Sequence, residues 1–310
     1  MGIISDVFSQ LGDWLTDALN STIGNWIGGI LGGIAKELMA HGMFFYNELT
    51  KMSVELLKQT PESWNGGTGW SVVTSVNTAF MAVGGSLVMI FWLIGLISMS
   101  VDERMNVRFE VMIKEFVKLF ATETLITGSV FILQVFFGLV DKLTSGFVPE
   151  SDAIQLTIPD DVNGYLTGTT VDVKSGAMCT IIGVLFFIGA VAAGGSILYV
   201  AYIRFFKVLL IVPYGAIASS TLVGGPSFNH SAANYYKYAV STVLEAATML
   251  LAIKISAAII SSDAINIVTN ETGTNDSTVI QWMFRALIMM FITMGAVKES
   301  GQITQRGLGM

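Results

Sequence analysis

Long apolar runs alternate with short polar segments along most of this chain. The runs that are long enough to cross a bilayer cover approximately residues 72–100, 119–140, 177–203, 238–262 and 279–297. A spanning helix needs about 20 mostly apolar residues, whereas a membrane barrel shows alternating apolar and polar positions. The pattern therefore predicts an all-α fold, a polytopic membrane helical bundle with about five transmembrane helices.

Residues 1–71, before the first predicted span, follow a different pattern. In residues 5–19 apolar side chains recur at helical spacing and aspartates lie on the other side, which predicts an amphipathic helix. A Gly-rich segment follows, and a second helix is expected over residues 34–58. We therefore predict an N-terminal helical region at 1–71 and a transmembrane domain at 72–310.

Small residues recur at intervals of four in two places. They are Gly24, Gly28 and Gly32 before the first span, and the pairs Gly189/Ala193 and Ala190/Gly194 in the third span. This spacing lets helix backbones approach closely in a membrane, although a Gly-rich segment equally suits a flexible hinge. We predict helix packing at these positions.

The stretch after the third span is ambiguous. Residues 205–223 are apolar over about the length of another span, but they contain Pro213 and Gly215. The stretch then leaves through Gly224, Gly225 and Pro226. It is either a sixth span or a re-entrant helical hairpin over residues 204–237, because broken backbone at membrane depth must face protein or water.

Loop charges favour the hairpin, since basic residues mark the cytoplasmic side of short loops. Four of them follow the first span (Arg104, Arg108, Lys114 and Lys118), whereas the loop at 141–176 has six acids and two lysines. A sixth span would put the loop at 263–278, which lacks Lys and Arg, inside and the tail at 298–310, with Lys298 and Arg306, outside. Five spans avoid this, so we predict an external N-terminal region and 141–176 loop, and a cytoplasmic tail.

Composition narrows the function further. Of the 310 residues 53% are hydrophobic and 13% charged, and the net charge of -7 argues against unaided nucleic-acid binding. There is no phosphate-binding loop with lysine, no HExxH and no GxSxG, so we expect neither an enzyme nor a cofactor. The single Cys179 cannot form an intrachain disulfide, and His41 and His230 are not in ligand-spaced clusters.

Ionisable residues in or beside the spans are the candidate polar site. They are Glu123, Arg204, Lys207, Glu245, Lys254 and Arg285. Such groups are costly in hydrocarbon and line a conduit, or else form interhelical salt bridges and snorkel. Glu245 and Lys254 are nine positions apart and point to opposite sides of one helix, so each needs another partner. The predicted topology places the two glutamates near Arg204 and Lys207, in the cytoplasmic half.

From about residue 56 onward, the chain resembles the TrbL-like family of conjugative type IV secretion systems. The resemblance is to the versions encoded by integrative and conjugative elements of Gram-positive bacteria. It rests on the order of three segments: LLKQTPESWNGGTGWSVVTSVNTAFMAVGGSLVMIFWLIGLI, RFFKVLLIVPYGAIASSTLVGG and NHSAANYYKYAVSTVLEAATMLLA. The family is described with an external N-terminus, five spans and a cytoplasmic C-terminus, as the charges predict here.

The resemblance implies an inner-membrane platform or channel subunit that helps DNA–relaxase or protein substrate cross the bacterial plasma membrane. It implies a homo-oligomeric ring in membrane lipid, other secretion components including ATPases as partners, and transient contact with the substrate. It carries over no catalytic residues.

Two other functions fit the residues. The intramembrane charges and the broken hairpin also suit a secondary transporter or small-solute channel. In a non-conducting membrane scaffold, the hairpin would serve packing alone.

Overall fold

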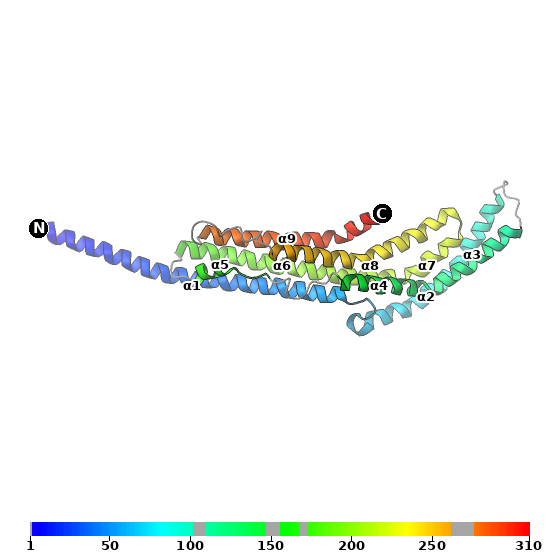
Figure 1. The fold of residues 1–310 in the computed structure, drawn as a ribbon, viewed down its shortest axis with the longest axis horizontal. Helices are drawn as coiled ribbons and strands as arrows, with labels where there is room; N and C mark the ends of the chain where they lie inside the picture. The colour runs from blue at the N-terminus through cyan, green and yellow to red at the C-terminus, as the bar shows by residue number, and fades with distance from the viewer. Residues whose placement is uncertain (1, 102–108, 147–155, 168–172, 262–275) are drawn as a thin grey trace. The chain divides into compact units, whose positions relative to one another are not determined.

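The computed structural model describes residues 2–101, 109–146, 156–167, 173–261 and 276–310 (Figure 1). Nearly all of these residues lie in helices, and none of them forms a β-strand. The all-α class predicted from the apolar runs is therefore confirmed.

Nine α-helices and two short 3-10 helices make up this described part of the chain. The α-helices are α1 (Gly2–Lys58), α2 (Thr68–Val101), α3 (Phe109–Thr127), α4 (Ser129–Ser145), α5 (Asp160–Thr167), α6 (Val173–Ile211), α7 (Tyr214–Ser220), α8 (Pro226–Ser261) and α9 (Asp276–Gly307). The 3-10 helices are η1 (Trp64–Gly67) and η3 (Thr221–Val223).

Five helical segments match the five predicted spans. Four are long and apolar enough to cross a membrane by themselves: Trp64–Ser98, Val173–Ile211, His230–Ile259 and Thr278–Gly307. The fifth consists of α3 and α4, which are bent by 59° at Gly128 and together pass the same test. The chain is a multi-pass membrane protein.

α1 differs from the predicted pair of helices with a Gly-rich segment between them. It is one continuous helix of 57 residues, so Gly24, Gly28 and Gly32 lie inside it. Glycine is a poor helix former, and close packing of these glycines against other elements offsets that cost. The helix ends shortly before Pro61, as the sequence predicts.

The helices form two compact units, and α1, α6, α8 and α9 contribute to both. Unit 1 contains Met1–Lys51, Pro149–Leu198 and Ile253–Gly295. Unit 2 contains Met52–Val148, Tyr199–Ala252 and Ala296–Met310. The predicted boundary at residue 71 lies between the region expected not to cross the membrane and the predicted spans. It does not coincide with a boundary between the two compact units.

In unit 1, α1 and α6 lie side by side and run in the same direction. A Cβ on Gly176 would lie 2.7 Å from the Gly28 carbonyl oxygen, and a Cβ on Gly194 would lie 3.2 Å from the Tyr46 Cα. The residue numbers rise together on both helices, which makes the pair parallel. Tyr46 is buried in this unit, and burial raises the pKa of its phenol.

A segment of the 141–176 loop lies along α1 in unit 1. The Asn47 side-chain amide donates to the Leu156 carbonyl oxygen (3.0 Å) and accepts from the Leu156 amide (3.1 Å). Ten residues further on, the Leu166 carbonyl oxygen lies 2.7 Å from where a Cβ on Gly32 would be. The two regions predicted to be external are therefore in contact.

In unit 2, the stretch around α7 runs along α2. Three glycines of α2 lie against it. A Cβ on Gly69 would be 3.1 Å from Leu209 Cδ1, and a Cβ on Gly84 would be 2.8 Å from the Ala216 carbonyl oxygen. A Cβ on Gly95 would be 3.0 Å from the Val223 carbonyl oxygen. The contacts advance along both segments together, so α7 follows the direction of α2.

The third span continues past its predicted end at residue 203. α6 reaches Ile211, because the first helix breaker after residue 203 is Pro213. The apolar helix Tyr214–Val223 is too short to cross a membrane by itself, so the described residues contain no sixth helix that is long enough to span. Gly225, with φ of 88°, turns the chain into α8, which begins at Pro226. The stretch is broken at Pro213 and at Gly225, as predicted, and its re-entrant topology stays a prediction.

That Arg204 and Lys207 share a membrane face with the basic loop after α2 stays a prediction.

Candidate functional site

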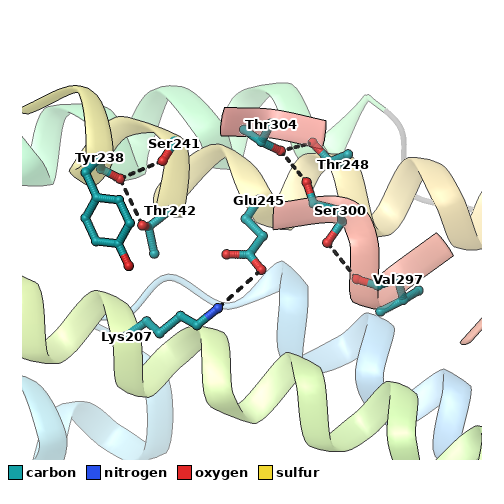
Figure 2. A network of polar contacts seen from close by, with 9 residues as sticks. All are labelled: Lys207, Tyr238, Ser241, Thr242, Glu245, Thr248, Val297, Ser300 and Thr304. Carbon is teal, nitrogen blue, oxygen red and sulfur yellow. Dashed lines mark hydrogen bonds and ion pairs between the residues drawn. The ribbon is translucent and has the colours of Figure 1, made fainter. Parts of the chain in front are cut away.

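An interhelical ion pair lies between α6 and α8 in unit 2. The Lys207 Nζ atom is 3.8 Å from Glu245 Oε1, as Figure 2 shows. The Glu245 side chain is 7% exposed and that of Lys207 is 47% exposed. The carboxylate is thus enclosed by protein, while the lysine reaches it from a partly open position.

Arg204 adds a second cation one turn before Lys207. The residue is 3% exposed, and its Nη2 donates to the Val243 carbonyl oxygen at 3.1 Å. Its Nε and Nη1 atoms are buried and have no hydrogen-bond partner among the described residues. The guanidinium carbon also lies 5.4 Å from the centre of the Phe205 ring. Arg204 is therefore a buried cation with unused donors.

A small cavity beside Arg204 opens between α4, α8 and the end of α1. Its lining includes Lys58, Thr60, Asp141 and Thr144. Its volume is about 10 Å³, which is room for about one water molecule. The cavity is therefore too small for a substrate.

Small and hydroxyl residues of α9 complete the site. A Cβ on Gly301 would lie 2.9 Å from Glu245 Oε1, so the carboxylate packs against the α9 backbone. The Thr248 and Thr304 hydroxyls are 2.8 Å apart, and Thr304 also donates to the Ser300 carbonyl oxygen (Figure 2). These contacts join α8 to α9 next to the ion pair.

The cluster combines two cations, one carboxylate and several hydroxyls. Arg204 and Lys207 outnumber the charge of Glu245, so the cluster carries a net positive charge. Its contacts tie α6, α8 and α9 together in unit 2. An interhelical salt bridge therefore accounts for Lys207 and Glu245. It does not account for Arg204, because its Nε and Nη1 atoms have no partner among the described residues.

The structure brings together three of the six predicted polar residues. Glu123 is exposed on α3, and its carboxylate lies 3.9 Å from where a Cβ on Gly85 would be. Lys254 is exposed, and its side chain forms no hydrogen bond or ion pair with a described residue. Arg285 is half-buried, and its Nη1 has no partner among the described residues. Glu245 and Lys254 do not pair, as their spacing predicts.

The predicted packing glycines all lie inside helices. Beyond the contacts of Gly28, Gly32 and Gly194 given above, a Cβ on Gly24 would lie 3.7 Å from Val173, and one on Gly189 would lie 2.7 Å from the Leu287 side chain. In the hairpin, Gly215 packs against Tyr235 and Ser129, and a Cβ on Gly224 would lie 2.9 Å from the Phe228 ring.

Sequence reasoning missed the α9 part of the site. Ser300, Gly301 and Thr304 follow a strongly apolar run and lie in the predicted cytoplasmic tail. Their spacing of one and three residues places them on one side of a helix, which is the signal that was available. Asn47 was also missed, because a single asparagine in a polar helix carries no pattern.

No metal or redox centre is evident in the described residues. They contain no group of three or more His, Cys, Asp or Glu side chains that could hold a metal ion, and Cys179 is a buried free thiol. Comparison of the chain with protein-family models, curated proteins and solved structures found no match.

Proposed function

We propose that this chain is a platform or channel subunit of a conjugative type IV secretion machine in the bacterial plasma membrane. The supporting observation is the order of elements. A Gly-rich helical region precedes five apolar segments, and a broken hairpin lies between the third and fourth. This order is the one on which the resemblance to the TrbL-like family rests.

In this proposal the N-terminal region is outside and the basic loop after α2 is cytoplasmic. The contact of α1 with residues 156–166 in unit 1 supports placing both on one side. The tail at 298–310 is cytoplasmic in this proposal, because five crossings that start from an external N-terminal region end inside, and Lys298 and Arg306 suit that side.

The chain acts as an oligomeric membrane part and not as a catalyst. Copies of it form a ring in the lipid, partner ATPases supply energy, and the DNA–relaxase substrate touches it transiently. The charge cluster holds α6, α8 and α9 in register within each copy. A membrane scaffold without a conduit would need the same charge cluster. A measurement of substrate passage distinguishes such a scaffold from a channel subunit.

Deletion of the gene from its element tests this proposal. Transfer to a recipient should be lost and should return when the intact gene is supplied in trans. Unchanged transfer after deletion would reject the proposal.

A small-solute transporter is the second candidate. Two helix breaks, at Gly128 and Pro213, meet in unit 2, and discontinuous helices are common at transporter binding sites. This function predicts solute flux into liposomes that contain the purified protein alone. The secretion proposal predicts no such flux without its partners.

A further inference from the structure

Two broken helices face each other in unit 2. The α3–α4 pair bends by 59° at Gly128, and the α6–α7 pair breaks at Pro213. A Cβ on Gly215 would lie 3.2 Å from the Ser129 Cβ, so the first turns after the two breaks are in contact. Gly215 permits this approach because it has no side chain.

Tyr235 of α8 reaches the same place. Its hydroxyl donates to the Ile211 carbonyl oxygen (2.9 Å) and lies 3.0 Å from where a Cβ on Gly215 would be. Pro213 has no N–H, so the Leu209 carbonyl lacks the hydrogen bond that a continuous helix would give it. Backbone and side-chain oxygens therefore gather at this junction.

α2 contributes Asn77, which is 4% exposed and has a buried Oδ1 without a hydrogen-bond partner among the described residues. Its position follows from the α2 register. Val73, one turn earlier, belongs to the core cluster that contains Leu209 and Val212, and Gly84, seven residues later, packs against Ala216. Residues at i, i+4 and i+11 share a helix face, so Asn77 lies level with the break at Pro213.

Both hydroxyl groups at this junction act as hydrogen-bond donors. Ser129 donates to the Ile126 carbonyl oxygen (2.9 Å), and Tyr235 donates to Ile211. Each hydroxyl oxygen then offers lone pairs, as does Asn77 Oδ1. A group of uncharged oxygen acceptors in a low-dielectric interior favours a bound cation, as at the broken helices of ion-coupled carriers.

We propose that this junction binds a small monovalent cation such as Na⁺, with Asn77, Ser129 and Tyr235 as side-chain ligands. The three ligands carry no formal charge, which suits a monovalent ion better than a divalent ion, whose sites use carboxylates. The junction is separate from the Lys207–Glu245 cluster. The inference stands independently of the secretion proposal, because it concerns binding to the isolated protein.

The test uses the purified full-length protein in detergent. Thermal unfolding is followed in NaCl and in N-methyl-D-glucamine chloride at equal ionic strength, together with equilibrium binding of radioactive Na⁺. We expect saturable Na⁺ binding and a Tm that rises with Na⁺ concentration, because a ligand that binds the folded state stabilises it. Ser129→Ala and Asn77→Val should lose both effects.

Ser241→Ala is the matched control. Ser241 is also buried, and its hydroxyl donates to a carbonyl oxygen three residues earlier (Tyr238, 2.8 Å), as Ser129 does. This variant should keep Na⁺ binding. Equal Tm in both salts without saturable binding would show that the junction holds water only and would overturn the proposal. Binding that survives in Ser129→Ala and Asn77→Val would overturn it as well.

Discussion

Glu245 is the residue on which the charge cluster depends. Replacing it with glutamine removes the carboxylate that faces Lys207 and leaves Arg204 as an uncompensated buried cation. We expect Glu245→Gln to lower the free energy of unfolding by about 1–3 kcal/mol, the cost of an unsatisfied buried polar group. Thermal unfolding of the detergent-solubilised protein, followed by tryptophan fluorescence, measures this.

Lys207→Gln is the control for that prediction. Lys207 is half-exposed, and an ion pair with one open partner contributes below about 1 kcal/mol. Lys207→Gln should therefore be milder than Glu245→Gln. A larger loss of stability in Lys207→Gln than in Glu245→Gln would contradict the buried position of the Glu245 carboxylate in the structure.

Two glycines of α9 have opposite surroundings. A Cβ on Gly301 would meet Glu245 Oε1 at 2.9 Å, whereas a Cβ on Gly295 would meet nothing within 4 Å. Gly301→Ala should destabilise by about 1–3 kcal/mol through overpacking, and Gly295→Ala should stabilise by up to about 1 kcal/mol through helix propensity. The difference in Tm between the two variants checks this, and equal shifts would contradict the close contact of α9 with Glu245.

The sequence predicts single residues of the site when they are charged. Arg204, Lys207 and Glu245 stand out in apolar runs, and their proximity follows from the order of spans. The partners of Glu245 on α9 do not stand out, because glycine and serine are ordinary in membrane helices. Which of the remaining charges would find partners was also unpredictable, because pairing depends on helix rotation.

At the scale of elements, Asn47 attaches the 156–166 segment to α1. Asn47→Ala removes two hydrogen bonds to Leu156, each contributing about 1 kcal/mol. We expect faster proteolysis and faster hydrogen exchange in residues 156–167. His41→Ala, at an exposed position on the same helix, should change neither. Unchanged exchange in Asn47→Ala would contradict the attachment.

The spans were predictable because hydropathy is a local property, and all five coincide with helical segments. The ends of the helices were less predictable. α6 continues past Arg204 because a cation with a partner on α8 does not need the membrane surface, and α1 continues through its glycines because α5 and α6 pack against them. Both depend on contacts between distant segments, which a pattern along one chain does not contain.

At the scale of the whole molecule, the five-span proposal makes a prediction about topology. The beginning of α2 should be outside and the tail near Gly301 should be cytoplasmic. Single cysteines at Ser63 and at Met310, in a Cys179→Ala background, can be labelled in intact cells with a membrane-impermeant maleimide. Labelling at Ser63 alone is expected, and equal labelling at both positions would contradict five spans with an external N-terminal region.

The most direct test of the account measures conjugative transfer from donors that lack the gene and are complemented with charge variants. Glu245→Lys and Lys207→Glu should each abolish transfer, because like charges then meet beside the buried Arg204. The double variant should restore it in part, with membrane abundance compared by immunoblot. Wild-type transfer by both single variants, at wild-type abundance, would contradict the account.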